Sequence, residues 1–259
     1  MDIVVLIKQV PDTATRIQDR VKNGQVDLDG VTWVVNPYDE YAVEEALQLK
    51  ERLGGTVTLV TLGPERAESA LKDMLALGAD EAVLVSDPAF NGLGPRATAH
   101  VLAEAVRKLP HDMIWTGWKG VDADQGLVPI YLAHELGYPH VSFVSAFEVD
   151  GTHATSKRDV EGGKEVIETD LPAVFTAQKG LNEPRYASLK GIMAVKRKQI
   201  PVWDSAELGV DPSTLGGAAV ETVTVERPPD RQAGRVIDGV PTDTARELVK
   251  LLHEEAKVI

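Results

Sequence analysis

Short apolar runs rich in β-branched residues alternate with helical patterns over about the first 140 residues of the chain. The runs at 3–7, 56–62, 82–86 and 112–116 are predicted strands. Between them, apolar residues at three- and four-residue spacing predict helices over 38–52, 64–77 and 95–108. Strands that alternate with helices in this way form right-handed βαβ units. The sequence therefore predicts a doubly wound α/β fold with a mostly parallel sheet.

Two hairpins interrupt or extend this pattern. Asn23-Gly24 between alternating residues predicts a small two-residue hairpin near residues 20–27. Farther along, a turn at 161–163 joins two strand-like stretches, 152–160 and 164–169. We interpret the region from 140 to 177 as an extension of the main sheet and not as a separate domain.

The composition of the chain changes after Ile200, where Pro and Gly become more frequent before a final amphipathic helix that is predicted near 242–256. We divide it into a nucleotide-binding α/β domain over 1–200 and a C-terminal arm over 201–259, and we expect that arm to pack on a partner subunit. The pattern alone is equally compatible with an arm that packs against its own domain.

The composition excludes several classes of function. The chain has no cysteine, so disulfides, thiolate metal sites, iron–sulfur clusters and a cysteine nucleophile are excluded. Its 27 Lys and Arg against 40 Asp and Glu give a net charge of −13, which disfavours nucleic acid as a partner. Residues 1–8 are charged too early for a signal sequence, and no apolar run approaches the ~20 residues of a membrane span. We expect a cytoplasmic protein without stable membrane insertion, whose redox chemistry, if any, comes from a bound cofactor.

The common catalytic motifs are missing from the sequence. It has no Gly-x-Ser-x-Gly elbow, no His-Glu-x-x-His helix and no Gly-x-x-x-x-Gly-Lys-Ser/Thr phosphate loop. His134 and His140 stand alone on a predicted helix and a predicted strand start. We assign no catalytic and no metal-binding residue.

Four loops are expected to meet at one edge of the sheet, where the carboxyl ends of parallel strands lead into helices. They contain residues 9–12, 36–39, 61–64 and 116–126. The last one precedes a predicted helix, and the free N–H groups at a helix N-terminus can hold a phosphate without a lysine. Loops of this kind are also common as plain capping turns. The spacing is therefore compatible with a small nucleotide in this cleft and with no ligand.

A basic segment at 185–198 stands out against the acidic background. Ser188 can cap a helix in which Leu189, Ile192 and Met193 share a face, with three cations at its end. The segment is either an ordinary solvated helix end or a docking site, in which an apolar anchor lies beside charges that attract an acidic partner.

Three stretches resemble a known family in order and spacing: residues 36–47, Gly78-Ala79-Asp80, and residues 181–189 with the sequence LNEPRYASL. They are similar to the β subunit of electron-transfer flavoproteins, and with Lys8 and 161–163 the resemblance covers essentially the whole chain. It implies a Rossmann-like subunit with a β-hairpin insertion and an extended C-terminal arm ending in a helix. This subunit would pair with a larger α subunit, whose mobile domain holds the redox-active FAD.

The resemblance also implies a role without catalysis. The β subunit supports the partner's flavin, which Tyr38 and Thr13 would face, and the heterodimer carries electrons from flavin dehydrogenases, such as those of fatty acid oxidation, towards a quinone reductase. Leu189 matches the family's partner-recognition leucine. The docking residues implied are Leu189, Lys190, Ile192 and Met193.

A nucleotide in the β subunit is implied as well. Simple carriers hold AMP there, whereas electron-bifurcating members hold a second FAD and react with NADH. The loop at 124–129 matches neither pattern fully; we favour AMP and keep the second FAD as the alternative. A stand-alone nucleotide-hydrolysing α/β protein is a third reading, disfavoured by the missing phosphate-loop lysine and by the long tail. The matching pocket positions are Leu6, Asn36, Asp39, Leu62, Gly63, Val121, Asp124, Gln125, Gly126, Leu127 and Val128.

Overall fold

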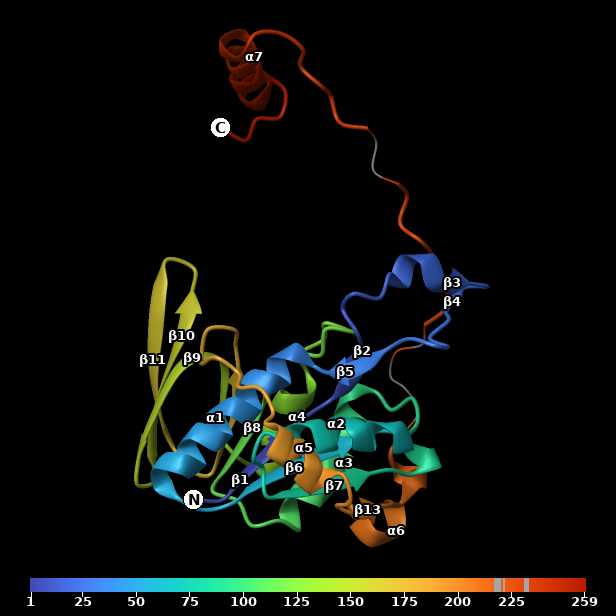
Figure 1. Cartoon of the computed structure of the whole chain (residues 1–259), viewed down its shortest axis with the longest axis vertical. Helices are drawn as coiled ribbons and strands as arrows, with labels where there is room; N and C mark the ends of the chain where they lie inside the picture. Colours follow the sequence, from blue (N-terminus) through green and yellow to red (C-terminus); the bar gives the residue numbers. More distant parts are fainter. Residues whose placement is uncertain (217–219, 221, 231–232) are drawn as a thin grey trace.

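The computed structural model describes residues 1–216, 220, 222–230 and 233–259. Figure 1 shows an α/β body built around one large sheet, and an arm that leaves the body and ends in helix α7 (Pro241–Glu254). The predicted fold class is therefore confirmed, including the arm with its terminal helix.

The central sheet has nine strands in the order β11-β10-β9-β12-β8-β1-β6-β7-β13. Strand β1 pairs in parallel with both β6 and β8, so the chain builds outwards on one side of β1 and then returns to build on the other. This topological switch point lies between β1 and β8. The parallel strands are β1 (Ile3–Leu6), β6 (Val57–Leu62), β7 (Glu81–Val85), β8 (Met113–Gly117), β12 (Ala173–Ala177) and β13 (Val202–Trp203).

Helices cover both faces of the sheet. One face packs on α1 (Pro37–Leu53) and on α2 (Glu68–Leu75), which follows the short helix η2 (Glu65–Ala67). The other face packs on α3 (Pro95–Arg107) and α4 (Val128–Leu136). Because successive strand residues point to opposite faces, Val5 belongs to the first core and Val4 to the second. Burial on both faces explains why the strands are continuous apolar runs.

At one end of the strand order, β9 (His140–Asp150), β10 (His153–Val160) and β11 (Gly163–Asp170) form an antiparallel extension. It joins the rest of the sheet through β9, which pairs with β12. This confirms that the region from 140 to 177 continues the main sheet. The Asn23-Gly24 hairpin is also confirmed, between β3 (Val21–Lys22) and β4 (Gln25–Val26), with φ values of 52° and 75° at its two turn residues.

Several short elements were not predicted. Residues 9–12 were interpreted as a loop, but β2 (Gln9–Pro11) pairs with β5 (Trp33–Val35). At the other end, β13 pairs with β7, and Leu208 of α6 (Ser205–Leu208) is buried in the core beside α3. The body therefore continues beyond residue 200, where we had placed the boundary. The remaining short helices are η1 (Ile17–Arg20), η3 (Pro88–Phe90), η4 (Pro212–Thr214) and α5 (Leu189–Val195).

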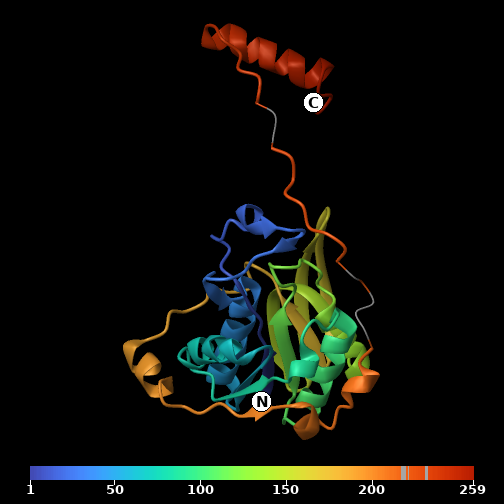
Figure 2. The same cartoon turned by 90° about the vertical axis from the view of Figure 1, so that its right-hand side faces the viewer.

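The arm crosses the tip of the small hairpin, where the Val225 N–H donates to the Gly24 carbonyl at 2.9 Å, and then runs away from the body. Helix α7 has no buried residue and stands apart from the sheet in both views (Figure 2). None of the described helices has the length and apolar character needed to cross a membrane.

Candidate functional site

Asp39 lies at the switch point, and its carboxylate joins the loops that follow β1 and β8. The backbone N–H of Lys8 donates to Oδ2 at 2.6 Å, and the N–H of Gly117 donates to Oδ1 at 3.0 Å. Asp39 is fully enclosed, and this burial raises its pKa to about 7 even though three N–H groups favour the charged form. A Cβ at position 117 would lie 2.3 Å from Asp39 Oδ1, so the close approach requires glycine.

Asn36 extends the same network to the loop after β8. Its Nδ2 donates to Asp39 Oδ1 and to the Lys119 carbonyl, both at 2.9 Å, and its Oδ1 accepts from the Val121 N–H at 3.1 Å. The polar atoms of Asn36 and Asp39 are thus engaged with the protein, and these two predicted pocket residues hold the loops in place.

The loop between β8 and α4 carries two carboxylates, and each is paired with a lysine. Lys8 Nζ lies 2.7 Å from Asp122, and Lys119 Nζ lies 2.8 Å from Asp124. Gly126 has a φ of +62°, and a Cβ there would lie 3.2 Å from the Trp118 carbonyl oxygen. The loop therefore reaches α4 through a conformation that favours glycine.

The start of α4 is open to an anion. Within the described part of the chain, the backbone N–H groups of residues 125–128 have no hydrogen-bond acceptor, and no side chain caps the helix. Free N–H groups and the positive end of the helix dipole suit a phosphate, and the paired lysines offset the nearby carboxylates. These residues fit the phosphate of a nucleotide.

A cavity of about 630 Å³ lies beside this loop, between the segment from residue 8 to 33 and the end of β6. Four predicted residues line it: Thr13, Leu62, Gly63 and Val121. The others lie elsewhere: Leu6 is buried in the core, and residues 124–128 lie on the adjoining loop outside the wall.

Two residues of this cavity, Trp33 and Arg66, lie outside the loops that the sequence predicts to meet here, and a third, Gln9, lies in one of those loops. The Arg66 guanidinium stacks 3.6 Å above the ring of Trp33, and no described carboxylate forms an ion pair with it. Gln9 donates through Nε2 to the Arg66 carbonyl and to Ser69, whereas its Oε1 is buried without a partner. The Arg66 guanidinium therefore suits a ligand that carries negative charge. The strand ends predict that the loops at 9–12 and 61–64 meet here, but nothing in the sequence indicates that Arg66 and Trp33 come together.

Tyr38, in the first turn of α1, packs edge-on against Trp118 with ring centroids 5.3 Å apart. Trp118 in turn contacts Phe143 at 4.8 Å. Tyr38 is half-buried against the loop after β8, whereas Thr13 is exposed at the mouth of the cavity. That both face a partner's flavin stays a prediction.

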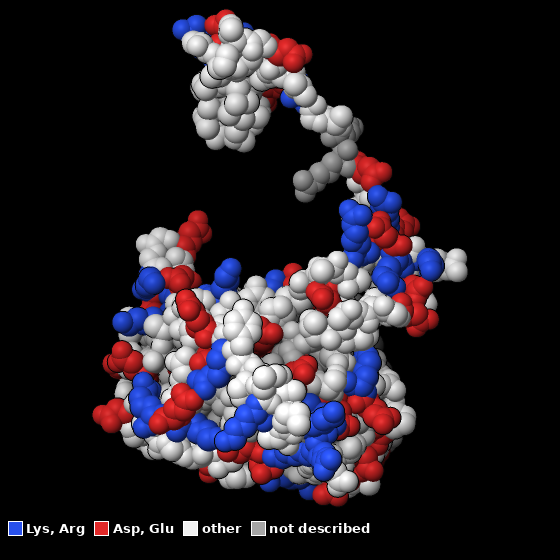
Figure 3. Space-filling view, viewed as in Figure 1, with Lys and Arg blue, Asp and Glu red and all other residues white. Residues whose placement is uncertain are grey.

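The basic segment forms α5, as expected, and the Ser188 hydroxyl caps it by accepting from the Gly191 N–H at 3.1 Å. Leu189 is 83% exposed and Met193 is 70% exposed, with Ile192 between them at 48%. Lysine and arginine side chains gather on the face of the body where α5 lies (Figure 3). Helix α5 therefore presents exposed apolar side chains next to basic residues.

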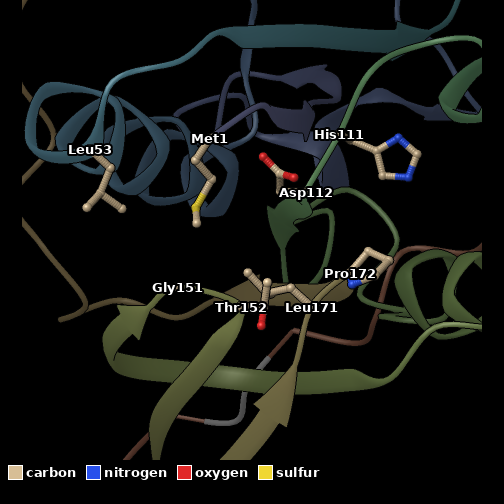
Figure 4. A pocket seen from close by; sticks show the side chains of 8 residues that line it. All are labelled: Met1, Leu53, His111, Asp112, Gly151, Thr152, Leu171 and Pro172. Atoms are coloured by element: carbon tan, nitrogen blue, oxygen red, sulfur yellow. The ribbon is translucent and has the colours of Figure 1, made fainter.

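A second cavity, of about 370 Å³, lies at the opposite, amino-terminal edge of the sheet (Figure 4). Its polar groups are already engaged: His111 bonds to the Leu109 carbonyl and to Tyr138, and Asp112 accepts from the Asp2 N–H. It contains none of the predicted site residues.

Comparison with known proteins gives a consistent result. Residues 23–208 match the family model described as the electron transfer flavoprotein domain. The chain is 42% identical over its whole length to the electron transfer flavoprotein subunit beta of Bacillus subtilis, with all of both chains covered. It is 39% identical to the subunit of the same name from Clostridium acetobutylicum, over 98% of this chain and 99% of the relative. It is 36% identical to the caffeyl-CoA reductase-Etf complex subunit CarD of Acetobacterium woodii, again over 98% and 99%.

Proposed function

The chain belongs to the electron transfer flavoprotein family as a β subunit, an electron-carrier component that pairs with an α subunit, and we propose that it binds AMP structurally and supports an FAD held mainly by that partner. In this proposal the chain contributes positioning and no chemistry of its own. The FAD, when bound in the heterodimer, supplies the electron-carrying chemistry.

The observation that carries the AMP assignment is the set of free N–H groups at residues 125–128, beside the switch point of the sheet. Ligands of open α/β sheets bind at such a point, because the loops diverge there and leave a crevice. Gly126 leaves the backbone accessible, and Gln125 adds an amide side chain that is exposed. We assign the phosphate to residues 125–128, and the rest of the nucleotide to the neighbouring positions Val121, Leu62 and Gly63.

We assign the contact with the partner's flavin to Thr13 and Tyr38. Thr13 lies at the cavity mouth, and Tyr38 is held by Trp118 at the same edge of the sheet. Tyr38 lies between Asn36 and Asp39 in the chain, so its position is tied to the loops that would hold the nucleotide.

The partners beyond the α subunit are flavin dehydrogenases as electron donors and a quinone reductase as acceptor. We assign their docking to α5, where Leu189, Ile192 and Met193 are exposed beside Lys190 and the cations at 196–198. Such a small apolar anchor in a charged rim suits a brief encounter, because charge speeds association and the anchor gives specificity. We assign the arm and α7 to contact with the α subunit.

A second FAD in this subunit is the alternative, with electron bifurcation from NADH as its function. The observation that favours it is the cavity lined by Arg66, since the guanidinium suits the negative charge that a flavin ring takes on reduction. A relative of this chain is named as part of a caffeyl-CoA reductase-Etf complex.

The deciding experiment is to co-express the chain with its α subunit, purify the heterodimer, denature it and identify the released nucleotides. One FAD and one AMP per heterodimer supports the proposal. Two FAD per heterodimer contradicts it and supports the alternative, and one FAD with no AMP contradicts the AMP site alone.

A further inference from the structure

Helix α5 turns one side towards the body and the other to solvent. Val195 is half-buried and packs against the core that contains α1 and α2, and Gly191 lies one turn before it. Leu189 and Met193, on the opposite side, are exposed. Since no residue of α5 is fully buried, few side-chain contacts hold the helix in place.

Gly191 is the point of closest approach between α5 and the body. A Cβ at this position would lie 2.2 Å from the carbonyl oxygen of Ala76, at the C-terminal end of α2, and 3.4 Å from Ser188 Oγ. The obstacle is backbone and cannot rotate away. The requirement for glycine is therefore one of space, because it allows α5 to rest directly on the end of α2.

Residues 181–188, the segment that leads into α5, are attached to α1 by a bidentate ion pair. Arg185 donates through Nε and Nη2 to the two carboxylate oxygens of Glu44 at 2.8 and 3.0 Å, and it also contacts Glu51. The side chain of Glu44 is only 5% exposed. Burial opposes its ionisation, but the hydrogen bonds from Arg185 and Gln48 prevail and hold the pKa of Glu44 below its usual value.

The segment after α5 is tied as well, since the Lys198 ammonium donates to the carbonyl oxygen of Asp80. A helix of seven residues is too short to be stable by itself, so these attachments decide where it points. Preorganised contact surfaces bind more tightly because less freedom is lost on docking.

We propose that Gly191, supported by the Arg185–Glu44 pair, is a positioning residue that sets the orientation of α5 and thereby the recognition of redox partners. The partner is a flavoprotein surface with an apolar pocket and an acidic rim, and it contacts Leu189 and not Gly191. This inference rests on the docking function proposed above for α5.

The test uses the purified heterodimer as electron acceptor of an acyl-CoA dehydrogenase reduced by its acyl-CoA substrate. Gly191→Ala should raise the KM for the heterodimer by about tenfold with kcat within about twofold, similar to the loss of an anchor residue. Ala194→Gly is the matched control: it lowers helix propensity at an exposed position of the same helix, and it should leave KM within about twofold. Reduction by dithionite, which needs no docking, should be unchanged in both variants.

The outcomes separate this inference from its premise. If Leu189→Ala raises KM but Gly191→Ala does not, docking stands and the positioning role of Gly191 is wrong. If Leu189→Ala has no effect, the docking function itself fails. Equal defects in Gly191→Ala and Ala194→Gly would show that helix stability matters and orientation does not. If Gly191→Ala does not fold, Glu44→Gln is the alternative variant, because it weakens the attachment of residues 181–188 and leaves the contact between α5 and α2 unchanged. An unchanged KM in that variant overturns the inference.

Discussion

Asn36 and Asp39 are hydrogen bonded to each other at the start of α1, with Nδ2 and Oδ1 2.9 Å apart. Through this pair, the loop after β5 is joined to those after β1 and β8. The buried Asp39 carboxyl is therefore the common attachment of the loops that surround the candidate nucleotide site.

The first prediction concerns pH. Because the pKa of Asp39 is about 7 in the folded chain and near its ordinary value when unfolded, the folded state holds an extra proton between about pH 4 and pH 7. The free energy of unfolding should thus fall as pH rises through this window, by on the order of 3 kcal/mol relative to Asp39→Asn. Urea unfolding of both proteins at pH 5 and at pH 7.5 measures this difference. Asp124→Asn, at an exposed carboxylate, is the control and should not remove the slope.

The layers of the fold could be predicted because strands that are buried on both faces are continuous apolar runs in the sequence, as at 3–7 and 112–116. The Asn23-Gly24 turn could also be predicted, since few residue pairs adopt two positive φ values. By contrast, β2, β5 and β13 have two or three residues each, and only their tertiary neighbours make them strands.

The candidate site was predicted in outline and not in detail. Strand ends indicate which loops converge, so the switch point with Asn36, Asp39 and the loop to Gly126 could be located from the sequence. Spacing carries no information about which side chains turn towards each other. The stacking of Arg66 on Trp33 and the unpaired Gln9 oxygen are therefore visible only in three dimensions.

The second prediction concerns the phosphate loop. Gly126→Val places a branched side chain at a φ of +62° and against the Trp118 carbonyl, so the loop must shift. We expect AMP affinity to fall about tenfold or more, which corresponds to about 1.4 kcal/mol. AMP released per heterodimer after gel filtration measures it. Gly137→Val, at the other end of α4 with a φ of +71° and open space around it, imposes similar strain and should leave the AMP content unchanged. Equal AMP loss in both variants would mean that helix stability is responsible.

The third prediction concerns Leu189, whose side chain is 83% exposed and makes no contribution to the core. Leu189→Ala should slow reduction of the heterodimer by a flavin dehydrogenase, with a loss of ~1–3 kcal/mol in binding. Stopped-flow reduction at increasing heterodimer concentration provides the measurement. Val166→Ala removes an exposed apolar side chain from β11, at the opposite edge of the sheet from β7 and β13, and should react normally. Dissociation of the heterodimer by Leu189→Ala would place this residue in the subunit interface instead.

The last prediction concerns the C-terminal arm. On α7, Leu248, Leu251 and Leu252 form an apolar stripe that no described part of the body covers. If this stripe binds the α subunit, the double change Leu248→Asp and Leu252→Asp should weaken the heterodimer by about thirtyfold or more, since each buried leucine contributes on the order of 1–3 kcal/mol and every ~1.4 kcal/mol is tenfold in affinity.

Dilution of the heterodimer followed by analytical ultracentrifugation measures that affinity, with Lys250→Asp on the opposite side of α7 as the charge-matched control. The thermal stability of the isolated chain separates the two readings that the sequence left open. An arm that binds the α subunit leaves the melting temperature of the free chain unchanged in the double variant, because α7 has no buried residue to lose. A lowered melting temperature with normal heterodimer affinity would instead show that the arm folds back on its own domain in solution.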